Sequence, residues 1–175
     1  IGSVHYVTGP DGEPRAVDWN EERLVRCCLE KFGGDFLALA REYYGEVQRM
    51  AARRPTILGH LDLIAKYNEG YRLFDERAAS YRAAALEALH AADPAVTLLE
   101  VNTGGMSRGY RKSPYPAIFL LREWRSMGGG IIFTDDAHSA DAIGFGYAQA
   151  AELAREAGFD RSTLLTRSGW EERPL

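Results

Sequence analysis

The sequence has no long apolar run, few cysteines and no excess of basic residues, and each absence excludes a class of protein. No apolar stretch approaches the ~20 residues of a transmembrane helix, and no signal peptide is visible, so we expect no membrane partner. The 2 cysteines, Cys27 and Cys28, are adjacent and poorly placed to bridge each other, which favours a cytoplasmic location. With 21 Lys and Arg against 25 Asp and Glu, the net charge is -4, so nucleic acid is not an expected partner.

The chain also lacks an initiator methionine, because it begins at Ile1 inside an apolar run. We therefore expect it to be a piece of a longer protein from which an N-terminal segment is missing. Its 175 residues are 46% hydrophobic and 26% charged, which is globular composition with enough apolar material for one sizeable core. No repeat or interdomain linker stands out, so residues 1–175 are expected to belong to one domain.

Short apolar runs alternate with longer stretches of helical spacing, a pattern typical of successive βα units around a parallel sheet. The expected strands are Ile1–Val7, Thr56–Leu63, Val96–Asn102, Gly130–Thr134 and Ser162–Thr166. Helical spacing appears over Leu24–Cys28, Phe36–Met50, Phe74–Ala92, Pro116–Met127 and Asp141–Ala157. Asn20 and Asp35 are the expected N-caps of the first two helices, because their side chains can accept hydrogen bonds from first-turn amides.

Histidine and aspartate lie where three apolar runs end, toward the carboxyl ends of expected strands, at His5, His60 and the pair Asp136 and His138. The carboxyl ends of strands in a closed α/β barrel share one mouth, where barrel enzymes keep their chemistry. Each group alone is better explained structurally, as a helix cap or a hydrogen-bonded histidine. Their joint occurrence on three strands favours a metal site instead, and mixed His and Asp ligation suits zinc, manganese or iron.

A glycine-rich turn follows the third expected strand and runs from Asn102 to Arg111. Its glycines allow a tight turn, and it carries two guanidinium groups, at Arg108 and Arg111. Guanidinium forks match phosphate oxygens and can bind them through two hydrogen bonds. On spacing alone, a solvated loop with two surface arginines explains the segment equally well.

A resemblance to a known family is carried by four segments, IGSVHYV, ILGHLDLIAKY, LLEVNTGGMSRGYRKSPYP and FTDDAHSADAIGFGYAQA. Together, and in this order, they resemble the polymerase-and-histidinol-phosphatase (PHP) superfamily, and within it the histidinol-phosphatase branch. The resemblance implies a distorted (β/α)7 TIM-like barrel, of which this chain supplies about the last five βα units. Residues 1–175 would then be the C-terminal portion of a single PHP barrel domain.

The same resemblance implies a metal-dependent phosphomonoesterase that hydrolyses L-histidinol phosphate to L-histidinol and phosphate in histidine biosynthesis. The complete protein would hold up to three divalent metal ions, and the substrate would be a small phosphate ester. The metal-ligand positions of the family are matched by His5, His60, Asp136 and His138. The expected catalytic residues are Asp136, His138 and Arg108, and the expected substrate-binding residues are Asn102, Arg108, Arg111 and Tyr115.

The chain departs from the family pattern in two places. The family's opening HxH motif, a further histidine and a bridging glutamate lie upstream of the GSVH segment, and this sequence has none of them. Asp135 stands where a serine usually precedes the DAH triplet, which adds a carboxylate that could alter metal preference.

Two other functions fit the same residues. Another PHP phosphoesterase would use the same metal motifs on a different phosphate monoester. A non-catalytic PHP-like binding module would explain the absent ligands, but it would have no need to keep both the four ligand-type residues and the arginine turn.

Overall fold

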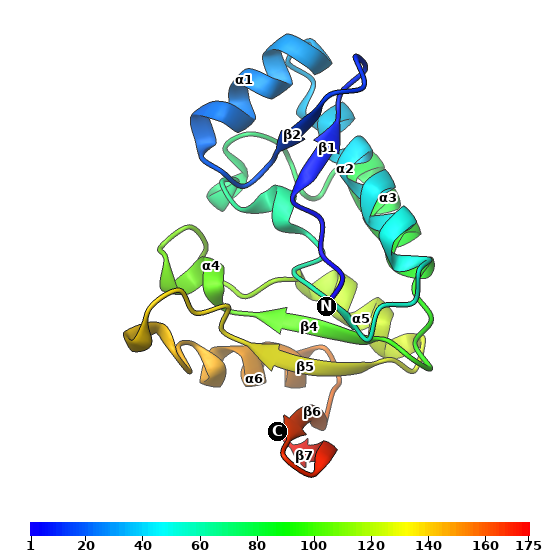
Figure 1. Ribbon diagram of the computed structural model, residues 1–175, viewed down its shortest axis with the longest axis vertical. Helices are drawn as coiled ribbons and strands as arrows, with labels where there is room; N and C mark the ends of the chain where they lie inside the picture. Colours follow the sequence, from blue (N-terminus) through cyan, green and yellow to red (C-terminus); the bar gives the residue numbers. More distant parts are fainter.

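The computed structural model describes residues 1–175 and is organised around a five-stranded sheet (Figure 1). Its strands, in spatial order, are β3 (Ile57–Leu58), β4 (Leu98–Asn102), β5 (Gly130–Thr134), β6 (Arg161–Thr166) and β7 (Gly169–Pro174). Strands β3 to β6 are parallel, and β7 returns antiparallel to β6. A separate antiparallel hairpin is formed by β1 (Tyr6–Thr8) and β2 (Pro14–Ala16).

Six α-helices and three short 3-10 turns connect these strands. The helices are α1 (Glu21–Phe32), α2 (Phe36–Ala51), α3 (Ala79–His90), α4 (Gly104–Ser107), α5 (Ile118–Ser126) and α6 (Tyr147–Glu156). The 3-10 turns are η1 (Leu63–Ala65), η2 (Glu69–Tyr71) and η3 (Ala140–Ala142). Both expected N-caps are confirmed, since Asn20 accepts a hydrogen bond from the first turn of α1 and Asp35 accepts two from α2. None of the helices combines the length and apolar character that a bilayer crossing requires.

The expected parallel βα organisation is confirmed, but two strand predictions are wrong in extent. Residues 1–7 do not form one strand: Gly2 makes a single parallel bridge to Leu58, and the chain turns into the β1–β2 hairpin further on. The expected strand Thr56–Leu63 is reduced to β3, because His60 adopts a positive φ of 22° that ends the extended backbone.

At the C-terminal end, two further features differ from the sequence expectation. Strand β7 was not expected, because its charged sequence lacks the apolar alternation of a half-buried strand. The last helix begins at Tyr147 rather than near Asp141, because Gly144 and Gly146 both adopt positive φ in the preceding loop.

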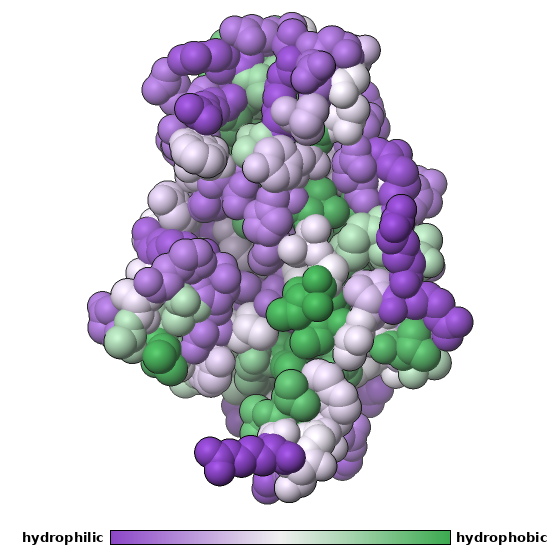
Figure 2. All heavy atoms as spheres, in the orientation of Figure 1, coloured by the Kyte–Doolittle hydropathy of each residue, from purple (hydrophilic) through white to green (hydrophobic).

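The two faces of the five-stranded sheet differ in how they are covered. Figure 1 shows α5 and α6 behind β4 and β5, and Trp124 of α5 donates a hydrogen bond to the Gly130 carbonyl at 2.9 Å. No helix lies in front of these strands, and Figure 2 shows apolar side chains gathered over this face. Three apolar residues at the N terminus and on β6 and β7 are strongly exposed, namely Ile1 (79%), Leu165 (59%) and Trp170 (48%). This apolar surface is the open face of the sheet.

Candidate active site

His5 and His60, the imidazole pair, lie side by side where the N-terminal segment passes the end of β3. Their ring centroids are 4.8 Å apart in an edge-to-face arrangement. His5 Nδ1 lies 2.9 Å from Asp18 Oδ2, and because a carboxylate only accepts, Nδ1 carries the proton. This hydrogen bond raises the pKa of His5. The lone pair of the neutral ring is then on Nε2, which lies 3.3 Å from Ser3 Oγ.

His60 is fixed through its backbone rather than through its ring. Its N–H donates to Glu100 Oε2 on the neighbouring strand β4. Burial lowers the pKa of His60, and its buried Nδ1 has no hydrogen-bond partner. A neutral imidazole with a free lone pair is the form of histidine that binds a metal ion.

Arg108, Asp136 and His138 form a second group, the arginine clamp. Arg108 Nη2 pairs with Asp136 Oδ2 at 3.0 Å, and Nη1 donates to the Asp136 carbonyl at 3.0 Å. The same carbonyl lies 2.7 Å from His138 Nδ1, and Arg108 Nη1 lies 3.0 Å from this nitrogen. The carbonyl calls for a protonated Nδ1 and the guanidinium for an unprotonated one, so these two contacts hold the ring in place without fixing its tautomer.

Gly104 allows the arginine clamp to close. A Cβ at this position would lie 2.8 Å from Arg108 Nη2 and 3.0 Å from Asp136 Cβ, closer than side chains normally approach. The turn after β4 thus brings Arg108 against the segment after β5. The structure places Arg108, Asp136 and His138, the three residues expected to be catalytic, next to one another.

The other expected substrate-binding residues lie beneath this turn. Asn102 is 1% exposed, and its Oδ1 accepts from the Gly104 amide at 2.8 Å. Tyr115 is 2% exposed and packs against Gly105. Arg111 Nη1 pairs with the buried Glu76 at 2.9 Å and donates to the Ala65 carbonyl. These contacts shape and anchor the turn, and they do not bring the three side chains into the arginine clamp.

Two side chains at the site were missed by the sequence reasoning. Asp18 orients His5, but no spacing pattern connects it to His5, because the β1–β2 hairpin lies between them. Lys66 Nζ donates to the Asp18 carbonyl at 2.7 Å and lies 4.7 Å from the Tyr110 ring centroid. Burial lowers the pKa of Lys66. Lys66 is the only lysine or arginine in the segment ILGHLDLIAKY, and this lone cation is the sequence signal that could have identified it.

Asp135, the departure from the family pattern, faces its own loop. Its Oδ2 accepts from the Gly144 amide at 2.7 Å, and its Oδ1 accepts from the Ala137 amide at 3.2 Å. These backbone donors, that of Gly144 above all, lower the pKa of Asp135. The extra carboxylate is thus used to order the loop between β5 and α6.

The donor chemistry of the imidazole pair and the arginine clamp fits a divalent cation, although the donors are not gathered on one point. His5 has Nδ1 bonded to a carboxylate oxygen and Nε2 left as acceptor, the usual state of metal-binding imidazoles. His60 adds the buried nitrogen without a partner. No group of three or more His, Cys, Asp and Glu side chains is placed to hold a metal ion, and the Asp136 carboxylate is ion-paired with Arg108.

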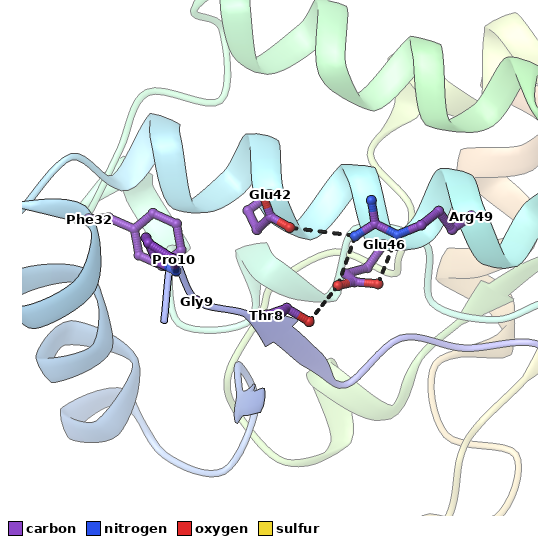
Figure 3. Close-up of a pocket in the computed structure, with 7 residues that line it drawn as sticks. All are labelled: Thr8, Gly9, Pro10, Phe32, Glu42, Glu46 and Arg49. Carbon is purple, nitrogen blue, oxygen red and sulfur yellow. Dashed lines mark hydrogen bonds and ion pairs between the residues drawn. The ribbon is translucent and has the colours of Figure 1, made fainter. Parts of the chain in front are cut away.

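A cavity of about 520 Å³ between β1 and α2 lies apart from these residues (Figure 3). Thr8 donates to Glu46 at 2.9 Å, and Arg49 pairs with Glu42 and Glu46 (Figure 3). Its polar groups therefore satisfy one another, and we assign it no chemistry.

Comparisons with known proteins give one consistent result. No family model matches the chain. The chain is 33% identical over 165 residues to the "Probable histidinol-phosphatase" of Deinococcus radiodurans, with 90% of this chain and 54% of that protein covered. It is 25% identical over 156 residues to the "Histidinol-phosphatase" of Bacillus subtilis, with 84% of this chain and 55% of that protein covered.

The structural comparison agrees with the sequence comparison at the level of the fold. The crystal structure of the Listeria monocytogenes protein hisK, assigned provisionally as a histidinol phosphatase, matches with a TM-score of 0.69 and 20% identity. The match covers 83% of this chain and 55% of that one. This chain thus spans about half the length of the relatives it matches. The chain is therefore similar in sequence to histidinol phosphatases over about half of their length, and it shares the fold of the hisK structure.

Proposed function

We propose that this chain is the metal- and phosphate-binding part of an enzyme that hydrolyses L-histidinol phosphate to L-histidinol and inorganic phosphate. The observation that carries the proposal is the position of the arginine clamp and of the imidazole pair's His60. They follow the carboxyl ends of three adjacent parallel strands, β3, β4 and β5. The names of the sequence relatives supply the substrate.

The residues that would hold divalent metal ions, zinc, manganese or iron, are His5, His60, Asp136 and His138. When bound, such ions would activate the attacking water and offset the charge on the phosphoryl oxygens. Up to three ions would require ligands beyond these four, since the present donors do not gather on one point. The family resemblance places such ligands upstream of the GSVH segment.

Arg108 is proposed to bind the phosphoryl group of the substrate. Its guanidinium is 30% exposed and is held by Asp136 alone among the carboxylates. A cation and Arg108 are alternative partners for the Asp136 carboxylate. If a cation were bound by this carboxylate, the guanidinium fork would be free to donate to phosphate oxygens. His138, as a neutral imidazole, is the group proposed to accept a proton from water.

The finer fold, a distorted (β/α)7 barrel with five βα units from this chain, is part of the same proposal. The open face of the sheet would be its interior, and further strands would cover Ile1, Leu165 and Trp170. The occupant would be a segment equivalent to the part of the Deinococcus radiodurans relative that this chain does not match, called here the complementary segment.

The test is phosphate release from histidinol phosphate by the chain alone and with the complementary segment supplied as a second chain. We expect metal-dependent turnover only when both are present. Other phosphate monoesters serve as substrate controls, and a preference for one of them would replace the substrate named here. Binding of the complementary segment without any turnover, at any metal tested, would instead support a non-catalytic module.

A further inference from the structure

Glu100 is a buried carboxylate at the centre of β4, between the two strands that lead to the candidate ligands. It is 4% exposed. Its Oε2 accepts the backbone N–H of His60, and its Oε1 accepts the hydroxyl of Thr134 at 2.7 Å. Since β4 lies between β3 and β5, one carboxylate joins the segments that follow both neighbouring strands.

The His60 side of this contact holds an unusual backbone conformation. His60 has φ of 22°, in the region that non-glycine residues rarely adopt. The hydrogen bond to Glu100 fixes its N–H in this conformation, and the preceding Gly59 makes room for it. A Cβ on Gly59 would lie 3.4 Å from Glu100 Oε2 and 3.0 Å from Ile1 Cγ2. The direction of the imidazole thus depends on a backbone held from β4.

The hydrogen bond between Thr134 and Glu100 fixes the start of the segment that carries Asp136 and His138. Thr134 is the last residue of β5, two positions before Asp136. Its hydroxyl donates to Glu100, and its carbonyl accepts from the Thr103 amide at 3.0 Å. The origin of the Asp136 turn is therefore bonded to the same carboxylate as His60.

Glu100 has no lysine or arginine partner within ion-pair distance, since none of the ion pairs of the structure includes it. Buried carboxylates are normally paired or close to a cation, because an uncompensated buried charge is costly. Its partners are the His60 N–H and the Thr134 hydroxyl, and its charge also acts on the His60 ring.

We infer that Glu100 is a positioning residue that sets the relative placement of His60 and the Asp136 turn from beneath the site. It does so through two hydrogen bonds, without touching substrate or cation. The importance of Glu100 for catalysis rests on the proposed function. Its geometry can be tested without any turnover.

The experiment compares Glu100→Ala, Glu100→Gln and Thr134→Val with the control Val101→Ala. Val101 is the next residue on β4, fully buried on the opposite face, so its truncation weakens the same strand without touching His60. Gln can accept from the His60 N–H and donate to Thr134, so it preserves both contacts. The readouts are the His60 amide chemical shift in the 175-residue chain and the affinity for Zn²⁺ alone.

We expect Glu100→Ala to shift the His60 amide resonance and to weaken Zn²⁺ binding about tenfold, the usual size for a residue that orients a ligand. Glu100→Gln should lose less Zn²⁺ affinity than Glu100→Ala. Thr134→Val should disturb the resonances of residues 134–138 more than that of His60, and Val101→Ala should change neither readout. An unchanged His60 resonance in Glu100→Ala, or an equal change in Val101→Ala, would overturn the inference. Wild-type chain that binds no Zn²⁺ would count against the proposed function, while the His60 resonance would still decide the role of Glu100.

Discussion

The imidazole pair and the arginine clamp meet at one end of the sheet, but they are held there by different means. His60 is fixed by a buried hydrogen bond to Glu100, and His5 by the Asp18 carboxylate. The clamp side chains Arg108 (30%) and Asp136 (41%) are no more exposed than His5 (42%), but a single ion pair between them holds the clamp closed. The imidazole pair is therefore preformed by the fold, whereas the clamp can exchange its partner.

The largest effect should come from removing a ligand of the preformed pair. His60→Ala deletes the only ring that combines burial with an unpartnered nitrogen. We expect Zn²⁺ affinity and phosphate release with the complementary segment to fall by about 100-fold or more, beyond the range for residues that only orient a ligand. Titration calorimetry and elemental analysis of protein purified without chelator measure the metal.

The matched variant in the arginine clamp is His138→Ala. It should also lower metal content and activity, but less than His60→Ala, because His138 is exposed and its turn can rearrange. Unchanged metal content in both variants would contradict the assignment of these histidines as ligands. An equal loss in both would mean that the two groups are not held differently.

Arg108→Ala should give the next largest effect and should separate phosphate binding from metal binding. A charge-assisted hydrogen bond is worth about 1.5 to 3 kcal/mol, so kcat/KM should fall about tenfold or more. Metal content should stay at or above the wild-type level, because Asp136 loses its competing partner. Arg108→Lys, which keeps the charge without the fork, should recover part of the loss. Wild-type kinetics in Arg108→Ala would exclude its contact with phosphate.

Much of this arrangement could be predicted from the sequence, because parallel βα units bring strand ends to one edge. His60, Asp136 and Arg108 each follow a strand of the parallel sheet, and their convergence follows from that topology. The glycines of the turn allow the close approach of Arg108, although spacing alone fitted a solvated loop equally well. Local spacing and one general rule of α/β folds were sufficient for these residues.

The remaining contacts depend on tertiary packing that carries no local signal. Asp18 reaches His5 only because the β1–β2 hairpin folds back, and the sequence favoured one continuous strand there. Arg111 was expected beside Arg108, but its partner Glu76 lies 35 positions away, and no spacing pattern connects the two residues. Whether an arginine faces solvent or a buried carboxylate cannot be derived from the arginine's own neighbours.

Asp18→Ala tests a smaller effect, the orientation of His5. Loss of the carboxylate should weaken Zn²⁺ binding about tenfold, because the ring loses its fixed tautomer and direction. Asp18→Asn should lose less Zn²⁺ affinity than Asp18→Ala, since its amide oxygen can still accept from His5 Nδ1. The pKa of His5, followed by NMR, should fall in Asp18→Ala, because the hydrogen bond that raises it is gone. An unchanged pKa would mean that His5 is oriented by other groups.

The smallest effect is expected at Asp135, the carboxylate that stands where the family usually has serine. Its two oxygens already serve the Gly144 and Ala137 amides, so it belongs to the loop and not to the ligands. We expect Asp135→Ser to leave the ratio of Zn²⁺ to Mn²⁺ affinity unchanged. Phosphate release should change by about twofold at most, since surface changes of this kind stay within about 0.5 kcal/mol.

Asp135→Asn sharpens this last comparison, because the amide keeps one acceptor oxygen for the loop and removes the charge. If Asp135 acts only on the loop, the Asp135→Asn variant should resemble wild type. The Gly144 amide should then exchange with solvent faster in Asp135→Ser than in Asp135→Asn. If Asp135 instead contributes charge to a metal ion, both variants should shift metal preference together. That outcome would assign Asp135 to the arginine clamp instead of the loop. The clamp would then be a more acidic site than its present contacts indicate.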